Sequence, residues 1–354
     1  MEILSLDLGN LQTKIKSSKA EKVLPSRFLD YDDLGDASTS IFENKYDVNQ
    51  YEAKFDDLFT YAWGVDLYKL HSKGNYIETI NFEDRYSTNE FKLLSTFAIG
   101  ELAKDFPEAK KGILDAVVVT GVPTDDFNKE SVKSIMRVLK GDHNVTINGE
   151  SLNVRVSEVK VLPQPIGTVY NEILDTKGYV KDEKEVLLEE QITTIDIGGG
   201  TILIDTLLNM NLSNEGRLQQ ETGAHKIYNS ITQSAIKDGI HGISNSTVEK
   251  ILRSPEDGKY YYKPSKNESF DITRIVEKAK VKYTRELINT INSTLKGTSK
   301  IDTLLFTGGG ANLINHDDIT KSFKHAIFVD NSEVANVNGY YKFGLATLLE
   351  EASV

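Results

Sequence analysis

The sequence contains no cysteine in its 354 residues, and it contains no long hydrophobic run. Without cysteine there is no disulfide framework and no thiolate metal site, so we expect the protein to reside in a reducing cytoplasm. No apolar stretch approaches the roughly 18 residues that a membrane span requires. The chain opens with a strand-like pattern from Met1, so no signal peptide is expected either.

Positive charge is also scarce in this chain. The 41 Lys and Arg residues face 53 Asp and Glu residues, which leaves a formal net charge of −12. Nucleic-acid binding depends on Lys and Arg clustered against phosphates, so we expect no direct DNA binding, although a basic partner that holds DNA is not excluded. The content of 39% hydrophobic and 27% charged residues is that of a soluble globular protein, and the length favours two domains.

A glycine turn between two apolar strands lies at residues 192–205. The β-branched runs on either side are typical of buried strands. Gly198, Gly199 and Gly200 allow a tight turn whose N–H groups a phosphate can approach, and Asp196 stands at the end of the first strand. Taken alone, this stretch fits an ordinary hairpin equally well.

The same pattern opens the chain at residues 3–16, with Asp7 before the turn. Asp7 and Asp196 therefore hold like positions in two similar segments, which indicates an internal duplication. A third glycine run, Gly308–Gly310, follows another buried strand. Strands and helices alternate along the chain, so the fold class is α/β.

Two helix starts are predicted from capping boxes. The first is Ser87-x-x-Glu90 and the second is Ser246-x-x-Glu249. A long helix is expected over about 272–295, and another helix closes the chain.

With these turns placed, the whole chain resembles the superfamily of actin, sugar-kinase and heat-shock-chaperone ATPases, because five motifs of that superfamily occur in order. In chain order they are the first phosphate loop (Asp7–Lys14), the first connecting helix (Leu162–Gly167), the second phosphate loop (Asp196–Thr201), the adenosine motif (Thr307–Gly310) and the second connecting helix (Asn336–Gly344). Four further segments are similar to the bacterial plasmid-segregation actins of the ParM type, in particular to the staphylococcal plasmid members: Tyr61–Leu70, Asn89–Leu93, Thr120–Pro123 and Ala335–Gly339.

The resemblance implies an actin-like fold, with two duplicated ribonuclease-H-like domains around a nucleotide cleft. Domain I is expected at 1–168 with a small subdomain at about 30–95, and domain II at 169–335 with a small subdomain at about 215–295. Residues 336–354 are expected to form a helix that returns to domain I. The implied protein is a filament-forming hydrolase of ATP or GTP with Mg²⁺, which segregates plasmid DNA through a DNA-binding adaptor at a centromere-like site.

The resemblance also implies roles for individual residues. Asp7 is expected to hold Mg²⁺ through water, Gln164 to position the attacking water, and Asp196 to orient or deprotonate that water. Lys14 is expected to lie on the phosphates as a point charge. The amides expected to grip the β- and γ-phosphates are those of Gly9, Asn10, Leu11, Gln12, Gly198, Gly199, Gly200 and Thr201.

Four of the residues expected near the nucleoside can be interpreted in two ways. Gly308, Gly309 and Gly310 are expected to line it. Tyr340 and Lys342 either close over the base or take part in the ordinary packing of their helix. Arg274 and Lys278 lie four residues apart on the long helix, and they either approach the ribose or are ordinary exposed helix charges.

Two positions depart from the pattern of the superfamily. Many relatives carry an acidic residue seven positions after the second-loop aspartate, where this chain has Leu203, and the nearest carboxylate is Asp205. Several bacterial relatives have Glu where Gln164 stands. The rate of hydrolysis and the preference for ATP or GTP therefore stay open.

Three other functions share parts of this pattern. A sugar or acetate kinase needs a sugar site, which residues 20–110 do not suggest. A chaperone ATPase needs a peptide-binding domain, for which the chain is expected to have no room. A cell-shape actin commonly touches membrane, and no amphipathic anchor opens this chain. Phosphate release that depends on an added sugar would favour the kinase.

Overall fold

The computed structural model describes residues 1–34, 46–69, 76–79 and 84–353 of the chain. Leu70 and part of the small subdomain expected at about 30–95 lie outside these residues. The chain forms two compact units. The first consists of Met1–Lys181 together with Asn336–Val354, and the second consists of Asp182–Ala335.

The first unit is built on a ten-stranded sheet with the strand order β3-β2-β1-β8-β10-β9-β5-β6-β4-β7. Antiparallel pairing joins β1 to β2, whereas β8 pairs in parallel with both β1 and β10. The strands are β1 (Glu2–Leu8), β2 (Gln12–Lys16), β3 (Glu21–Pro25), β4 (Arg27–Asp30), β5 (Asn49–Ala53), β6 (Asp56–Trp63), β7 (Ile77–Glu78), β8 (Leu114–Val122), β9 (Gly141–Ile147) and β10 (Glu150–Pro163).

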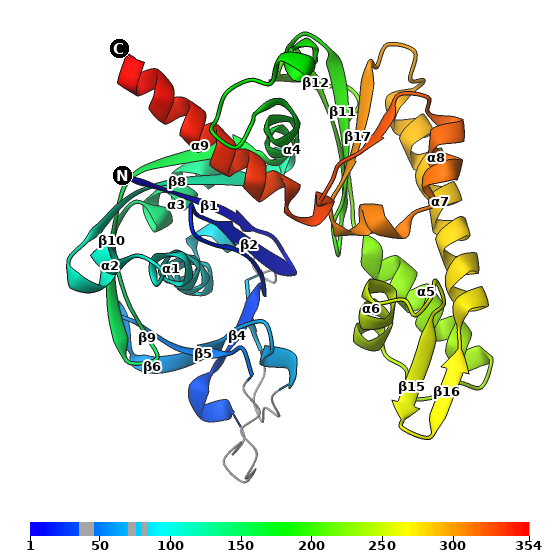
Figure 1. Cartoon of the computed structure of the whole chain (residues 1–354), viewed down its shortest axis with the longest axis horizontal. Coiled ribbons are helices and arrows are strands. Elements are labelled where there is room, and N and C mark those ends of the chain that lie inside the picture. Colours follow the sequence, from blue (N-terminus) through cyan, green and yellow to red (C-terminus); the bar gives the residue numbers. More distant parts are fainter. Residues whose placement is uncertain (35–45, 70–75, 80–83, 354) are drawn as a thin grey trace. The chain divides into compact units, whose positions relative to one another are not determined.

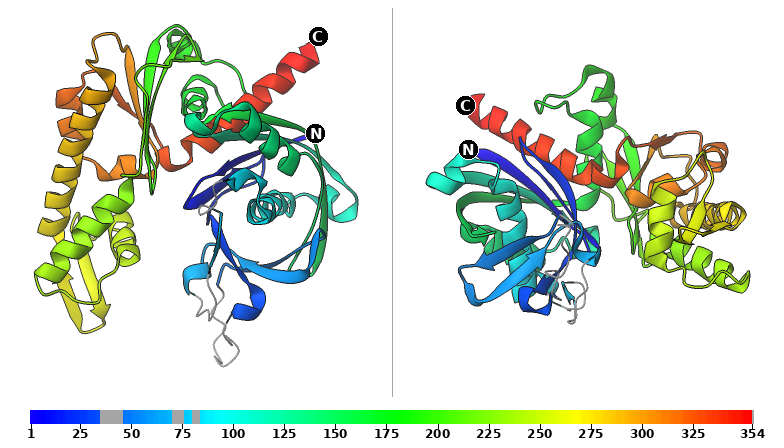
Figure 2. Two further views of the ribbon diagram at one scale, coloured as in Figure 1. Left: turned by 180° about the vertical axis from the view of Figure 1, so that it is seen from behind. Right: turned by 60° about the horizontal axis from the view of Figure 1, so that its bottom comes forward.

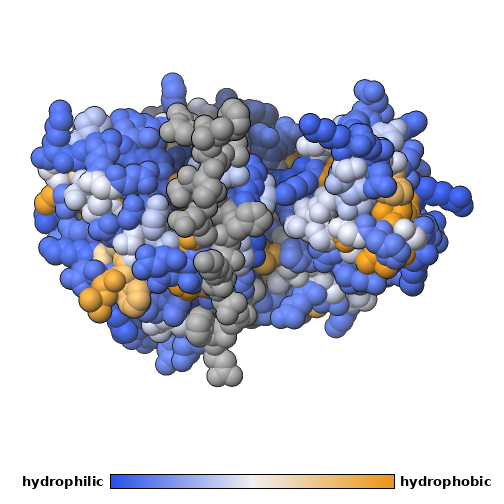
Figure 3. Space-filling model, turned by 90° about the horizontal axis from the view of Figure 1, so that it is seen from below, coloured by the Kyte–Doolittle hydropathy of each residue, from blue (hydrophilic) through white to orange (hydrophobic). Residues whose placement is uncertain are grey.

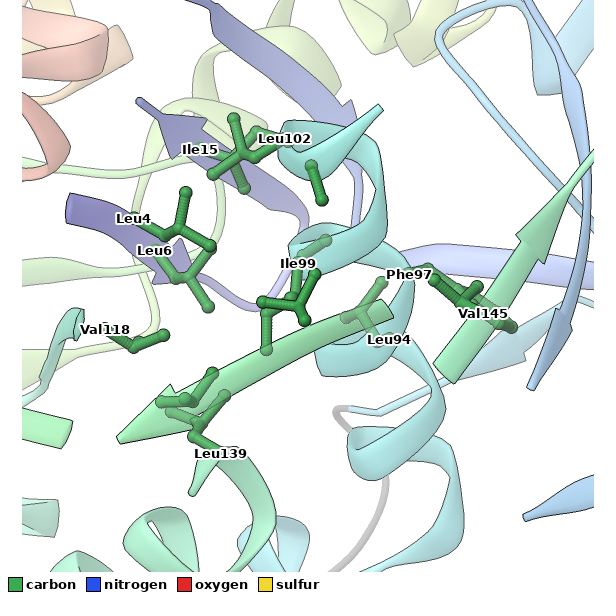
Figure 4. Packing of buried hydrophobic residues seen from close by; sticks show 14 of the residues in the cluster. Leu4, Leu6, Ile15, Leu94, Phe97, Ile99, Leu102, Val118, Leu139 and Val145 are labelled. Carbon is green, nitrogen blue, oxygen red and sulfur yellow. The ribbon is translucent and has the colours of Figure 1, made fainter. Parts of the chain in front are cut away.

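This sheet curves around helix α1, as Figures 1 and 2 show. Helix α1 is apolar on nearly every side, so it is a core helix rather than a surface one. Figure 4 shows its side chains Leu94, Phe97 and Ile99 among residues from the surrounding strands. The helices of this unit are α1 (Asn89–Ala103), α2 (Pro107–Lys111), α3 (Lys129–Leu139), α4 (Gln164–Ile173) and, from its second residue onward, α9 (Ala335–Ser353).

The second unit repeats the central strand arrangement of the first in a smaller sheet. Its strand order is β13-β12-β11-β17-β18, with β14 also paired to β12. As in the first unit, an antiparallel hairpin (β11–β12) is followed by two parallel neighbours (β17 and β18). The strands are β11 (Gln191–Ile197), β12 (Ile202–Leu208), β13 (Asn211–Leu212), β14 (Leu218–Gln220), β17 (Thr303–Thr307) and β18 (Ala326–Phe328).

Four α-helices and a separate hairpin complete the described part of the second unit. Helices α5 and α7 pack against the sheet through a second hydrophobic cluster that includes Ile195, Ile231 and Leu287. The remaining elements are α5 (Ala224–Lys237), α6 (Asn245–Arg253), the hairpin of β15 (Tyr261–Ser265) and β16 (Glu268–Asp271), α7 (Thr273–Leu295) and α8 (His316–Ser322).

Both predicted capping boxes are wrong. Helix α1 is capped by Thr88, whose hydroxyl oxygen accepts from the Phe91 amide at 3.1 Å. Helix α6 is capped by Ser244, whose hydroxyl oxygen accepts from the Thr247 amide at 3.2 Å. In each case another hydroxyl residue close by in the sequence takes the cap position, because local sequence alone does not decide which one the backbone places there.

The surface shown in Figure 3 is mainly hydrophilic, with hydrophobic groups confined to small areas. Across the described ranges, none of the helices has the length and apolar character needed to cross a membrane.

Candidate functional site

The first aspartate turn lies at the end of β1. Asp7 is buried, with 3% of its surface exposed, and Lys14 is its cross-strand partner in β2. The Lys14 ammonium group donates to Asp7 Oδ2 at 3.2 Å. The hairpin therefore holds one carboxylate and one ammonium group together at the edge of the turn.

The carbonyl groups of the first turn are held from one side by two polar side chains. Arg85, in the 3₁₀ helix η4 (Arg85–Ser87), donates to Leu8 O at 2.6 Å and to Gly9 O at 3.1 Å. The Ser26 hydroxyl also donates to Gly9 O, at 2.6 Å. In a planar trans peptide, the C=O and the following N–H point in opposite directions. The amides of Gly9 and Asn10 therefore point away from these donors.

Gln164 lies at the same end of the first sheet. It is the first residue of α4 and directly follows β10, whose Leu162 pairs with Gly121 of β8. Since Leu6 of β1 pairs with Thr120 of β8, Asp7 is level with Leu162 across two strand spacings, or roughly 10 Å. The carboxyl ends of parallel strands are the usual location of ligand sites in α/β folds.

The second aspartate turn repeats the first at the end of β11. Asp196 is buried, with 7% exposed, and its cross-strand partner is Leu203, at the position that corresponds to Lys14. The other carboxylate considered for this position, Asp205, is buried and faces Arg217, whose Nε lies 3.4 Å from Oδ1. The Asp205 carboxylate is therefore paired with the guanidinium group of Arg217.

The carbonyl groups of the second turn are held by the start of helix α5. The amides of Ala224 and His225 donate to the carbonyl oxygens of Gly198 and Gly199, both at 2.9 Å, and the amide of Gly223 donates to Gly200 O at 3.0 Å. By the same peptide geometry, the amides of the next three residues point away from α5. These amides belong to Gly199, Gly200 and Thr201.

One of the predicted phosphate donors is already used within the second turn. The Gly198 amide donates to Thr201 O at 2.8 Å. The turn therefore offers the three amides that follow Gly198 rather than all four that the sequence suggested.

The third glycine turn lies directly against the second. Strands β11 and β17 are parallel neighbours, and Asp196 pairs with Thr307. Gly308 has a φ of +83°, and a β-carbon there would collide with Asp196 Oδ1 and with Ile197 O, so only glycine fits. Gly310 packs on the Ile197 side chain, whereas the atoms nearest to an added β-carbon at Gly309 belong to Glu333, at 3.6 Å or more.

The remaining nucleoside candidates lie on helices α7 and α9. Arg274 and Lys278 are exposed on α7. Tyr340 is fully buried and its ring packs against Gly121 and Gly167.

Lys342 is held within the first unit. Its ammonium group donates to Asn171 O at 2.7 Å and to Asn171 Oδ1 at 2.9 Å. Burial lowers the pKa of Lys342 to about 8. For Tyr340 and Lys342, the structure agrees with the packing alternative.

Sequence reasoning missed three residues that shape the turns. Arg85 stands 77 residues from Leu8, and nothing near it in the sequence indicates this contact. Ser26 directly follows strand β3, and no local pattern in the sequence indicates its hydrogen bond to Gly9 O. Gly223 directly precedes helix α5, and glycine is the usual residue where backbone segments approach closely.

The donors for a metal are few. Across the described residues, no group of three or more His, Asp and Glu side chains is placed to hold a metal ion. The Asp7 carboxylate lies at the start of a turn whose Gly9 and Asn10 amides point away from the donors that hold its carbonyl groups. One carboxylate suits a Mg²⁺ ion, because Mg²⁺ keeps most of its water and takes one or two protein ligands.

Two family models match most of the chain. The model for the N-terminal domain of actin-like proteins matches residues 5–167, and the model for the C-terminal domain of Alp7A matches residues 191–343. None of the curated proteins matches the chain.

Solved structures with the same fold include three informative cases. The ligand-free psk41 ParM protein is 24% identical with a TM-score of 0.77, over 99% of this chain and 98% of that one. The ADP complex of the archaeal actin homologue Ta0583 is 17% identical with a TM-score of 0.72, over 97% and 99%. A ParM from Clostridium botulinum, solved as a 15-stranded filament, is 19% identical with a TM-score of 0.70, over 97% and 98%.

Proposed function

This chain belongs to the actin-like proteins and has their fold, and from that premise we propose that it is a nucleotide-dependent, filament-forming ATPase that segregates plasmid DNA. In this proposal it binds ATP or GTP with Mg²⁺, polymerises in that state, and loosens after hydrolysis. It reaches the plasmid through a DNA-binding adaptor at a centromere-like site.

The observation that carries the proposal is the shape of the two aspartate turns. In each turn, the carbonyl oxygens accept hydrogen bonds from donors on one side, so the consecutive amides that follow them point to the opposite side. Consecutive outward amides form an anion-binding concavity suited to phosphate. Lys14 adds a cation to the first turn. A polyphosphate ligand matches this pattern better than a neutral one does.

The proposed catalytic roles are those that the resemblance to the actin-like family implies, and the chemistry of the side chains is compatible with them. Gln164 carries a neutral amide that both donates and accepts, so it positions a water molecule, and Asp196 accepts a proton from that water. Asp7 holds Mg²⁺ through water, and the ion neutralises phosphate charge when bound. The third turn, Gly308–Gly310, lies against the second turn and lines the nucleoside in this proposal.

The proposal draws further support from the related structures. The Ta0583 structure contains ADP, and the Clostridium botulinum ParM was solved as a filament. The adaptor is proposed because a chain with a net charge of −12 is poorly suited to bind DNA directly.

One assay tests the proposal. Purified protein is mixed with ATP or with GTP in the presence of Mg²⁺, and light scattering and released phosphate are followed together, with EDTA as the control. We expect scattering to rise and later to fall as phosphate is released. A sample that neither scatters nor releases phosphate with either nucleotide refutes the proposal.

A further inference from the structure

We propose that Arg85 is a positioning residue for the first aspartate turn, and that it fixes this turn in the shape that receives phosphate. The inference rests on the proposed function, because it requires a nucleotide to bind at this turn. Arg85 acts through the backbone of the turn, which it contacts directly.

The first line of support is the set of contacts that Arg85 makes. One guanidinium nitrogen, Nη2, donates to Leu8 O at 2.6 Å and to Gly9 O at 3.1 Å. The other, Nη1, donates to Asn10 Oδ1 at 2.9 Å. A single side chain thus connects three consecutive residues of the turn. The flat fork of arginine can make all three bonds at once, whereas the single ammonium group of lysine cannot reach them with the same geometry.

The second line of support is the anchoring of Arg85 itself. Its own carbonyl oxygen accepts from the Thr88 hydroxyl at 2.9 Å, and Thr88 caps the buried helix α1. The neighbouring Tyr86 hydroxyl donates to Asp126 Oδ2 at 2.7 Å. The segment that carries Arg85 is therefore anchored to the first unit, and its guanidinium group also lies over the ring of Phe91 in α1, 5.5 Å from the ring centroid.

The third line of support is the charge that remains beside the turn. Burial lowers the pKa of Arg85, although the nearby Tyr86, Asp126 and Asp7 oppose this effect. Its Nε is buried and has no hydrogen-bond partner in the described part of the chain. An incompletely paired cation is a costly way to hold a turn if stability is the only benefit. Next to amides that point outward, it also favours the approach of an anion.

The test compares three variants with the wild-type protein. Arg85→Met removes the charge and all three bonds, and Arg85→Lys keeps the charge but not the fork. Ser87→Ala is the matched control, because it removes a hydrogen bond to Ser134 from the same 3₁₀ helix and leaves Arg85 and the turn untouched. Each is measured for affinity towards fluorescent ATP and GTP analogues, for kcat and KM, and for thermal unfolding.

We expect Arg85→Met to weaken nucleotide binding by about 10- to 100-fold, because it loses charge-assisted bonds to the turn. KM should rise far more than kcat falls. Ser87→Ala should keep the wild-type affinity whatever its effect on the melting temperature, which separates positioning from general stability. If Arg85→Met does not fold, Arg85→Lys decides, and a reduced affinity in that variant supports the inference.

Two results overturn the inference. Wild-type affinity in a folded Arg85→Met protein, or in Arg85→Lys where the Met variant does not fold, overturns it alone. A wild-type chain that binds neither nucleotide overturns the proposed function, and the inference with it.

Discussion

At the scale of single residues, the two aspartate turns are stabilised in different ways. In the first turn, the side chains of Arg85 and Ser26 hold the carbonyl oxygens. In the second turn, backbone amides at the start of α5 do so. The first turn is therefore sensitive to changes of side chain, whereas the second is sensitive to any change that alters the backbone of residues 223–225.

Gly223 is the residue at which the second turn is most easily disturbed. A β-carbon there would lie 2.5 Å from Gly198 O, 2.7 Å from Thr201 N and 2.8 Å from Gly199 O, and all three atoms belong to backbone. We expect Gly223→Ala to destabilise the protein by about 1–3 kcal/mol, as overpacking does. It should also weaken nucleotide binding about tenfold or more, because the turn is displaced.

The measurement for Gly223→Ala is urea unfolding together with nucleotide titration. Asn229→Ala, an exposed change on the same helix, is the control and should alter neither quantity. Wild-type affinity in the Gly223→Ala protein would show that the start of α5 does not set the shape of the turn.

Asp196 and Gln164 are expected to act on the water that attacks the nucleotide. Asp196→Ala and Gln164→Ala should each slow phosphate release, by about 10²- to 10⁴-fold where general-base help is lost. Nucleotide affinity should stay near the wild-type value, because the amides of both turns are kept. Single-turnover phosphate release and nucleotide titration check this, and unchanged turnover in both variants would refute the assignment.

At the scale of elements, the sequence predicted the parts that depend on local pattern. The hairpins of β1–β2 and β11–β12, the helix α7 and the α/β class all follow from periodic burial and from glycine turns. The actin-like fold expected from five ordered motifs is confirmed by the family models and solved structures. The capping boxes failed because several hydroxyl residues compete at each helix start.

The candidate site was predictable only in part. Asp7, Lys14 and Asp196 stand at the turns, since strand ends and hairpin register are local features. The use of the Gly198 amide inside its own turn depends on the detailed hairpin geometry, which spacing does not fix. The packing of Tyr340 and the reach of Arg85 depend on contacts across long sequence separations, which a single sequence does not reveal.

A buried carboxylate links helix α1 to strands β3 and β5. Glu101 is 2% exposed and accepts from Lys22 at 2.9 Å, from Lys104 at 2.6 Å and from the Tyr51 hydroxyl at 2.5 Å. Burial raises the pKa of Glu101, but these hydrogen bonds lower it more, so its net pKa lies below the usual value. The stability that it contributes is therefore present above the unfolded-state pKa and is lost as the pH falls through the folded-state pKa.

We expect Glu101→Gln to lower the free energy of unfolding by about 1–3 kcal/mol near neutral pH, because two ammonium groups lose their anionic partner. The difference from wild type should shrink on acidification, since the wild-type carboxylate becomes neutral as well. Urea unfolding at about pH 7 and at about pH 2.5, well below the usual pKa of a glutamate, measures it. An equal difference at both pH values would contradict this explanation.

At the scale of the whole molecule, the negative charge decides how the protein meets DNA. The net charge of −12 predicts no salt-sensitive binding of plasmid DNA by the purified chain. Fluorescence anisotropy with labelled duplex DNA, at low and physiological ionic strength and with and without nucleotide, checks this. Tight binding in the absence of any other protein would remove the reason for an adaptor.

The bonds between α5 and the second turn also bear on how fast and how tightly a ligand can be captured. Glycine loses more conformational freedom on ordering than any other residue, and fixing one backbone unit costs about 1–2 kcal/mol in entropy. Gly198, Gly199 and Gly200 already have their carbonyl groups fixed. Their loss of entropy therefore occurs during folding instead of during capture, so a loop that is flexible by composition behaves as a preorganised receptor.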